Sequence, residues 1–250
     1  METKNEILML NSLLECEQFK NTDYELPIAL GKTVGGDVFM LDLSKIPHLL
    51  IAGGSGQGKT VSINAITKSL QHKREESELK FELIDTKQTE LDAVVQTLQS
   101  LCNEMEDRFQ LLRKAKARNI KDYNNKFALG KLKTEEGYRN LPYIVVVIDE
   151  FADIILSAGR EFETPIVKLA QMSRAVGIHL IIATQHISNK VLTGVILANF
   201  SARLVFKVQE KEESSYLLGF SEATLLKRPG DAFYSCGNEI THLQCAFISD

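Results

Sequence analysis

The chain has 250 residues, of which 44% are hydrophobic and 25% charged, enough for one large domain or two small ones with a sizeable core. A formal net charge of −4 excludes a wholly basic nucleic-acid coat but leaves room for local basic patches. The four cysteines are far apart and form no CxxC pair, so we expect reduced thiols rather than disulfides or a zinc site.

The two ends of the chain predict small elements. Residues 1–24 read as a polar, partly helical lead-in. The stretch ELPIALGKTVGGDVFMLDL then places two short apolar segments around Gly35-Gly36, which is the pattern of a β-hairpin. In the tail, DAFYSC and THLQCAFI flank Gly237-Asn238 and predict a second, closing hairpin.

Five short apolar runs alternate with helical patterns between the two hairpins. They begin at His48, Leu79, Tyr143, Ile178 and Ala202. Their apolar residues are consecutive rather than alternating, which is typical of a sheet that is buried on both faces. Because helices lie between the runs, the sequence predicts an α/β fold with a parallel sheet.

The first apolar run leads into GGSGQGKT, which matches G-x-x-x-x-G-K-[ST] between a strand and a helix. Glycines let such a loop curl until several backbone N–H groups face phosphate oxygens, and the helix N-terminus adds partial positive charge. Lys59 is predicted to reach the β- and γ-phosphates, and the Thr60 hydroxyl to take a magnesium position. We therefore expect ATP and Mg²⁺ as cofactors, bound by Gly53, Gly54, Ser55, Gly56, Gln57, Gly58, Lys59, Thr60 and Val61.

A long amphipathic helix is predicted after the second run. Apolar residues recur every three or four positions over Leu91–Leu112. Thr89 followed by Asp92 resembles a helix-start box. Beyond this helix, residues 113–139 carry nine Lys/Arg against three acids. Such a basic patch suits contacts with a phosphate backbone, or equally a solvated helix end followed by a loop.

The third run ends in an acidic pair, in the sequence YIVVVIDEF. Asp149 is predicted to hold magnesium through water, and Glu150 to orient or deprotonate the attacking water. Gln185 ends the fourth run, and ligands of parallel sheets sit beyond the carboxyl ends of strands. It is a candidate γ-phosphate sensor or a surface glutamine, whereas His179 starts the same run and is expected to be structural.

A further helix is predicted between the third and fourth runs. Thr164 and Pro165 read as its N-cap and first position, and Gly177 as its stop, which places Arg174 in the last turn. A guanidinium from a neighbouring subunit is a common way to complete an NTP site. Spacing alone leaves three candidates for that role: Arg160, Arg174 and Arg203.

Seven ordered blocks resemble the motor domain of the FtsK/SpoIIIE DNA translocases, from about Glu25 to the C-terminus. They are ELPIALGK, PHLLIAGGSGQGKT, NEMEDRFQLL, RNIKDYNNKF, LPYIVVVIDEFAD, LAQMSRAVGIHLIIATQ and GVILANFSARLVFKV. The resemblance implies a RecA-like ATPase domain over residues 25–250, with a mainly parallel sheet flanked by helices. It further implies an ATP-hydrolysing motor that assembles as a ring, usually a hexamer, around double-stranded DNA and serves chromosome partition at cell division.

By position, the resemblance makes Lys59 and Thr60 the Walker A residues and Asp149 and Glu150 the Walker B pair. Arg174 lies where the family carries its inter-subunit arginine finger. Two channel-facing loops of the family map to segments around residues 118–126 and 186–193. The residues of these segments that we expect to contact DNA are Arg118, Asn119, Lys121, Lys126, His186 and Lys190.

Four departures from the family pattern concern DNA grip and subunit coupling rather than nucleotide chemistry. His186-Ile187 stands where the family has Arg-Pro, and a later stretch around Ser215 lacks the family's arginine. Asp85-Thr86-Lys87 replaces Asp-Pro-Lys, and the stretch after Glu90 is too short for the strand that the family places there.

Three functions remain open from the sequence. The first is a DNA translocase motor, the second a related ATPase for conjugative DNA transfer or protein secretion, and the third a degenerate paralogue that binds nucleotide without turnover. No apolar run reaches the roughly 18 residues of a spanning helix, and no signal peptide opens the chain. We therefore expect a cytoplasmic protein, tethered to a membrane only through some other segment.

Overall fold

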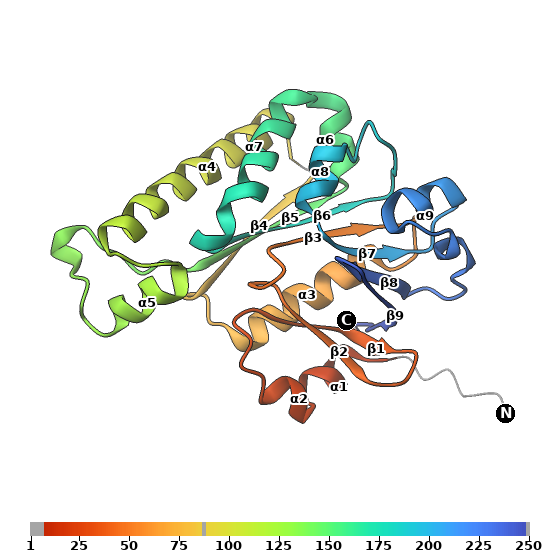
Figure 1. Ribbon diagram of the computed structural model, residues 1–250, viewed down its shortest axis with the longest axis horizontal. Coiled ribbons are helices and arrows are strands. Elements are labelled where there is room, and N and C mark those ends of the chain that lie inside the picture. Colours follow the sequence, from red (N-terminus) through yellow and green to blue (C-terminus); the bar gives the residue numbers. More distant parts are fainter. Residues whose placement is uncertain (1–7, 87–88, 249–250) are drawn as a thin grey trace.

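The computed structural model describes residues 8–86 and 89–248, and within these ranges the strands form one nine-stranded sheet (Figure 1). Its strand order is β2-β1-β9-β8-β7-β3-β6-β5-β4. The strands are β1 (Pro27–Thr33), β2 (Val38–Asp42), β3 (His48–Ala52), β4 (Leu79–Asp85), β5 (Tyr143–Asp149), β6 (Ile178–Thr184), β7 (Ala202–Phe206), β8 (Asp231–Cys236) and β9 (Glu239–Cys245).

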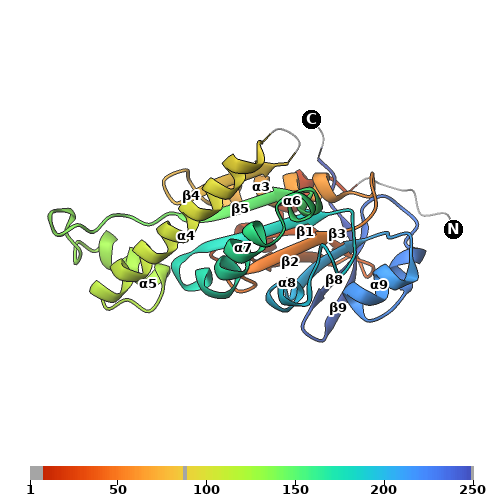
Figure 2. The same cartoon turned by 90° about the horizontal axis from the view of Figure 1, so that it is seen from above.

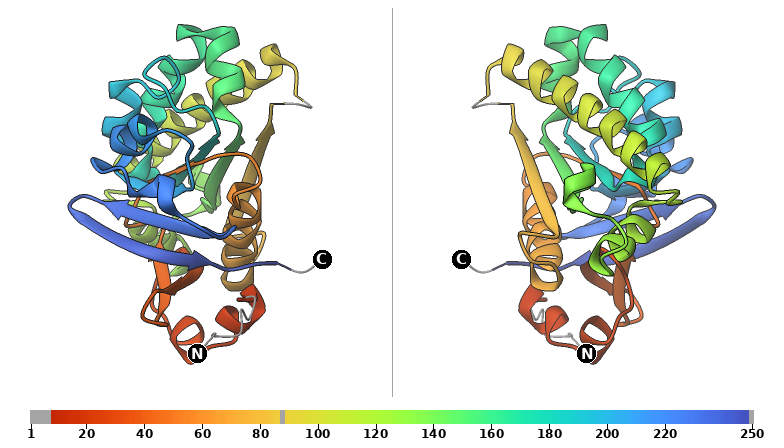
Figure 3. Two further views of the ribbon diagram at one scale, coloured as in Figure 1. Left: turned by 90° about the vertical axis from the view of Figure 1, so that its right-hand side faces the viewer. Right: turned by 90° about the vertical axis from the view of Figure 1, so that its left-hand side faces the viewer.

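Helices cover both faces of the sheet. The helices α4, α6 and α7 lie side by side over the parallel strands with α8 next to them (Figure 2), and α1, α2 and α3 lie on the opposite side (Figure 3). The α-helices are α1 (Leu10–Leu14), α2 (Glu17–Lys20), α3 (Lys59–Lys73), α4 (Leu91–Lys114), α5 (Ile120–Ala128), α6 (Phe151–Ala158), α7 (Arg160–Met172), α8 (Gly194–Asn199) and α9 (Lys211–Leu218). Three 3₁₀ turns are η1 (Thr134–Glu136), η2 (Ser173–Val176) and η3 (Glu222–Leu225).

The sheet combines a parallel and an antiparallel half. The five predicted apolar runs form β7-β3-β6-β5-β4, all parallel, and the two predicted hairpins supply the other four strands. This confirms the α/β fold. The hairpins also join each other through β1 and β9, where a Cβ on Gly31 would lie 2.1 Å from the carbonyl oxygen of Gln244. Only glycine allows this close approach of the two strands.

The strand β4 differs from the prediction of burial on both faces. It is the edge strand of the sheet, and Lys80, Glu82 and Leu83 are exposed. A run of consecutive apolar residues is typical of a strand that is buried on both faces. The run does not show whether the strand lies at the centre of the sheet or at its edge, where one side has no neighbouring strand.

Both predicted helix starts were wrong. The helix α7 begins at Arg160 directly after Gly159 (φ 54°), and Pro165 lies inside it. Phe162 is fully buried against Phe151 of α6, with ring centroids 6.0 Å apart. This tertiary packing stabilises a helical turn ahead of Pro165. At α4 the N-cap residue is Glu90, which makes no side-chain capping bond. Gly177 (φ 74°) does end the later helical segment, as predicted, directly after η2.

The N-terminal segment packs on the sheet. Leu10, Leu13 and Phe19 are buried in a cluster with Ala29 of β1 and Ala65 of α3.

None of the described helices is long and apolar enough to cross a membrane. The division of the chain at residues 24 and 25 stays a prediction.

Two buried histidines lie at the amino ends of β3 and β6. The Nδ1 atom of His48 accepts the backbone N–H of Leu180 at 3.0 Å, and His179 Nδ1 lies 3.0 Å from the carbonyl oxygen of Pro47. Burial, with smaller contributions from His179 and Arg174, lowers the pKa of His48 to about 3. Burial also lowers the pKa of His179 to about 4. These contacts confirm a structural place for His179.

The free energy of unfolding is expected to fall as the pH drops from about 6.5 to 5. In this range the two histidines bind protons in the unfolded chain but stay neutral where they are buried in the folded chain. Each histidine would lower the free energy of unfolding by roughly 2 kcal/mol at pH 5, relative to an ordinary histidine with a pKa of 6.5. Denaturant unfolding at both pH values checks this. His48→Asn, whose amide oxygen can still accept the Leu180 N–H, should lose part of the pH dependence. The same change at exposed His72 should leave it intact, and equal behaviour of the two variants would contradict the assignment.

Candidate nucleotide site

The glycine-rich loop joins β3 to α3 at the carboxyl end of the parallel strands. Gly53, Gly56 and Gly58 adopt positive φ values of 149°, 71° and 123°. A Cβ on Gly53 would lie 2.7 Å from the Cβ of Phe206 in β7, so this glycine lets the loop pack tightly against the neighbouring strand. The loop ends at the N-terminus of α3, which begins with Lys59. Loop and helix dipole therefore form the expected phosphate cradle.

Lys59 is held inside this loop. Its Nζ donates to the carbonyl oxygens of Gly53 (2.8 Å) and Gly54 (3.0 Å), and the residue is 9% exposed. Burial lowers its pKa, while the nearby carboxylates of Glu150 and Asp149 act in the opposite direction. A buried ammonium with only two carbonyl partners has a donor left for a phosphate oxygen.

The acidic pair follows β5 on the same edge of the sheet. Asp149 ends the strand and pairs in register with Asp85 of β4. Glu150 is 7% exposed, and its backbone adopts φ 60°. Its Oε1 accepts the Thr184 hydroxyl at 2.8 Å, and both carboxylate oxygens lie 3.2 Å from the backbone N–H of Gln185. The ends of β5 and β6 thus bring together residues that lie 35 positions apart in the chain.

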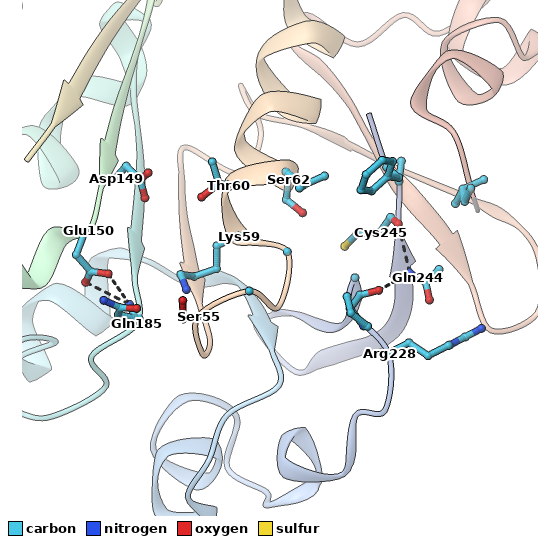
Figure 4. Close-up of a pocket in the computed structure, with 18 of the residues that line it drawn as sticks. Ser55, Lys59, Thr60, Ser62, Asp149, Glu150, Gln185, Arg228, Gln244 and Cys245 are labelled. Atoms are coloured by element: carbon cyan, nitrogen blue, oxygen red, sulfur yellow. Dashed lines mark hydrogen bonds between the residues drawn. The ribbon is translucent and has the colours of Figure 1, made fainter. Parts of the chain in front are cut away.

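These residues line one cavity of about 620 Å³. In Figure 4, Lys59 and Thr60 lie between the acidic residues on one side and Arg228, Gln244 and Cys245 on the other. Its polar end is lined by Ser55, Gly56, Gly58, Lys59, Thr60, Asp85, Thr86, Asp149, Glu150 and Gln185. Its other end is lined by Leu8, Val61, Ser62, Arg228, Pro229, Gly230, Gln244, Cys245, Ala246 and Phe247.

The C-terminal wall of this cavity was missed by sequence reasoning. The N–H of Gly230 donates to the carbonyl oxygen of Gln57 at 2.9 Å, which fastens the turn before β8 to the phosphate loop. Phe247 exchanges backbone hydrogen bonds with Leu8 and Leu10, and both Leu8 and Phe247 line the cavity. No local motif marks these residues, because β9 reaches the cavity only through its pairing with β1 and β8. Asp85 and Thr86 also line the cavity, whereas Lys87 lies outside the described residues.

The donor set fits a magnesium ion that is held in part by phosphate. Thr60 and Asp149 both line the cavity and offer the hard oxygen ligands that Mg²⁺ prefers. No group of three or more His, Cys, Asp or Glu among the described residues could hold a metal by itself. Mg²⁺ usually keeps several waters and takes one or two carboxylates together with substrate phosphates, which agrees with this sparse set.

Arg174 lies far from the cavity of its own chain. It is exposed in η2, before the amino end of β6, whereas Gln185 follows the carboxyl end of the same strand. The seven residues of β6 span roughly 23 Å at about 3.3 Å per residue. This distance excludes Arg174 from the cavity of its own chain.

Arg203, a second arginine that spacing left open, already has partners within the chain. The guanidinium of Arg203 is half-buried, and its three nitrogens donate to the backbone carbonyls of Phe200, Leu217 and Leu197. It braces the segment between α8 and α9. The side chain of Arg160 lies outside the described part of the chain.

The six residues expected to contact DNA fall at two opposite ends of the sheet. Arg118, Asn119, Lys121 and Lys126 belong to α5 and the turn before it, at the amino end (Figure 1, left), while His186 and Lys190 lie in the loop after β6 at the carboxyl end. The structure does not bring the two segments together within one chain.

The α5 residues also have partners within the chain. Lys121 Nζ lies 2.5 Å from Glu25 Oε1, and Asn119 caps α5 by accepting the N–H of Asp122. Lys126 Nζ donates to the carbonyl oxygen of Lys116 at 2.8 Å. Asn119 and Lys126 thus stabilise the junction of α4 and α5, and Lys121 connects α5 to the segment before β1. His186 and Lys190 are exposed, as are Arg118, Asn119 and Lys121.

Comparison with known proteins identifies close relatives over nearly the whole chain. The model of the FtsK/SpoIIIE family matches residues 9–95 and 88–189. The DNA translocase FtsK of Chlorobaculum tepidum is 40% identical over 97% of this chain and 32% of its own length. That of Staphylococcus aureus strain Mu50 is 37% identical over 100% of this chain and 34% of its own length. The chain thus spans about a third of the length of these relatives.

Two solved structures share the fold. The conjugation coupling protein TcpA of pCW3, solved as a monomer with ATPγS, superposes with a TM-score of 0.80 at 28% identity, over 92% of this chain and 68% of that one. The cytoplasmic domain of the type VII secretion ATPase EccC from Thermomonospora curvata gives a TM-score of 0.82 at 22% identity, over 98% of this chain and 32% of that one. The predicted P-loop ATPase fold is therefore confirmed.

Proposed function

Because the chain belongs to the FtsK/SpoIIIE family, we propose that it is an ATP-hydrolysing motor domain that moves double-stranded DNA. The observation that carries this proposal is the single cavity lined by the phosphate loop, the acidic pair and Gln185. One end offers a cationic and amide-rich cradle for a triphosphate, and the other offers apolar walls for a nucleoside.

The chemistry at the polar end follows from the positions of the side chains. Lys59 and the loop amides would bind the β- and γ-phosphates, and Thr60 with Asp149 would hold Mg²⁺. The ion would neutralise charge that develops on the transferred phosphoryl group. Glu150 would orient and accept a proton from the attacking water, with Gln185 beside the γ-phosphate.

A ring of subunits is part of the proposal. Arg174 lies at the opposite end of β6 from the cavity, so its guanidinium can reach a nucleotide only across an interface. We propose a homo-oligomeric ring, a hexamer as in the family pattern, working in the cytoplasm in chromosome partition at cell division. The likeness to TcpA supports conjugative DNA transfer as the second candidate, since this coupling protein shares 28% identity with the chain.

The test is ATP hydrolysis by the purified chain with and without a linear duplex at low salt, together with its size with and without nucleotide. We expect the duplex to raise turnover and nucleotide to promote assembly. Turnover that is indifferent to the duplex would contradict the DNA motor, and stimulation by a secretion peptide instead would favour a secretion ATPase. Equal background rates for the wild type and Lys59→Ala would point to an inert paralogue.

Charge reversal at Lys190 is expected to weaken DNA binding and to reduce the slope of log affinity against log salt by about one, since each neutralised phosphate contributes roughly 0.9. Binding titrations over a range of salt concentrations measure this slope. Lys45→Glu, at an exposed lysine beside the first hairpin, is the matched control and should leave the slope unchanged. Arg118→Glu tests the α5 segment separately, and an unchanged slope at either position removes that segment from the DNA site.

A further inference from the structure

The side chain of Thr184, the last residue of β6, lies between Glu150 and the loop 186–193. Thr184 is fully buried, and its Oγ1 lies 2.8 Å from Glu150 Oε1. The backbone N–H of His186 donates to the same oxygen at 3.1 Å, and the carbonyl oxygen of His186 lies 3.3 Å from it. One hydroxyl therefore contacts both the proposed catalytic carboxylate and the first residue of the loop.

The Thr184 hydroxyl can donate a hydrogen bond to only one of its two acceptors at a time. A threonine hydroxyl has one hydrogen to donate, and here it can go to Glu150 Oε1 or to the His186 carbonyl. The shorter contact, to Glu150, is favoured in the present geometry. A displacement of the loop that shortens the His186 contact draws the hydrogen away from Glu150.

Glu150 is held in a way that such a change would alter. Besides Thr184, the carboxylate is bound by the backbone N–H of Gln185, and these contacts turn it toward the end of β6 (Figure 4). Its backbone occupies the left-handed region, which is uncommon for a buried residue other than glycine and costs on the order of 1–3 kcal/mol. The Thr184 hydroxyl is one of the two groups that hold this carboxylate, so its withdrawal would loosen the orientation of Glu150 at the edge of the cavity.

The loop is fixed at its far end and exposed in between. Tyr216 of α9 donates to the carbonyl oxygen of Leu192 at 2.6 Å, and Thr193 donates to Glu163 of α7 at 2.6 Å. Between these anchors and Thr184, His186 and Lys190 are exposed. A ligand that displaces the exposed part thus acts on the near end, where the backbone contacts the Thr184 hydroxyl.

We propose that Thr184 is a positioning residue that couples the loop 186–193 to Glu150, so that a ligand on the loop regulates hydrolysis at the cavity. The identity of that ligand, double-stranded DNA, rests on the proposed function. The coupling between the loop and Glu150 does not depend on that identity. Coupling between two sites is reciprocal, so nucleotide in the cavity must also affect the loop.

The experiment compares Thr184→Val, which removes the hydroxyl at nearly constant shape, with Thr184→Ser, which keeps it. Thr184→Ala removes the same hydroxyl and is a second variant if valine is not tolerated. Thr67→Val is the matched control, because its hydroxyl bonds only the carbonyl of Ile63 within α3. The first readout is amide hydrogen exchange of residues 185–193 in the full chain with and without Mg·ATPγS. The second is the ratio of ATP turnover with a linear duplex to turnover without it.

We expect nucleotide to change exchange in the loop of the wild type, Thr184→Ser and Thr67→Val, and to leave it unchanged in Thr184→Val, although a fluorescent ATP analogue still binds. The duplex-stimulation ratio should fall to about one in Thr184→Val and Thr184→Ala, and should keep its wild-type value in Thr184→Ser and Thr67→Val. A nucleotide effect on the loop that survives in Thr184→Val and Thr184→Ala, or that Thr184→Ser also loses, overturns the proposal. A wild type that ignores the duplex contradicts the DNA motor instead, and the exchange readout still decides the role of Thr184.

Discussion

Glu150→Gln is expected to bind ATP and fail to hydrolyse it, with turnover lower by about 10²–10⁴-fold, the usual contribution of a general base. The amide oxygen of glutamine can still accept the Thr184 hydroxyl and the Gln185 N–H, so the fold of the site should persist. What is lost is a carboxylate able to take a proton from water. Single-turnover hydrolysis and binding of a fluorescent ATP analogue separate the two steps.

The matched control for this substitution is Glu161→Gln, at an exposed position in the first turn of α7. It makes the same chemical change outside the cavity and should retain the wild-type rate. Wild-type turnover in Glu150→Gln would show that another group activates the water. Loss of nucleotide binding in that variant would instead assign Glu150 a role in holding the ligand.

Arg174→Ala is expected to lower turnover by about 10³–10⁵-fold, because arginine fingers contribute on that scale to phosphoryl transfer. The structure sharpens this prediction. The roughly 23 Å length of β6 separates Arg174 from its own cavity, so the loss must arise at the site of a neighbouring subunit. Binding of ATP to an isolated subunit should be unaffected.

Mixing Arg174→Ala with Lys59→Ala tests this arrangement directly. Each variant is inactive alone, but an Arg174→Ala subunit keeps its phosphate loop and can receive the arginine of a Lys59→Ala neighbour. We expect partial recovery of activity in mixtures. No recovery at any ratio, in particles that sizing shows to be mixed, would contradict an inter-subunit finger. Arg174→Lys is the conservative comparison, since lysine keeps the charge but not the planar fork.

The chemistry of the site was predictable from short segments. The loop Gly53–Thr60 and the pair Asp149-Glu150 are contiguous in the sequence, and their conformations depend on local geometry: glycines at positive φ and a strand that ends in acids. The carboxyl ends of parallel strands lie at the same edge of a sheet. The position of Gln185 at the end of an apolar run was therefore enough to predict that it lies near the phosphate loop and the acidic pair.

Other features depended on contacts between distant residues. Burial of Phe162 between two helices moved the start of α7 ahead of Pro165, and the lack of an outer neighbour left β4 half exposed. The separation of α5 from the loop 186–193 also follows from the direction in which α4 crosses the sheet. Periodicity reports on which residues are apolar, not on which elements cover them.

The sequence by itself determined the phosphate loop, the acidic pair and the parallel α/β core, because glycine freedom and apolar periodicity act within a few residues. Only the tertiary structure decided that the C-terminal hairpin walls the cavity and that the Thr184 hydroxyl meets Glu150. It also decided that Arg174 lies beyond reach of its own site. These are pairings between segments tens to hundreds of residues apart, and they follow from the register and order of the strands rather than from any local preference.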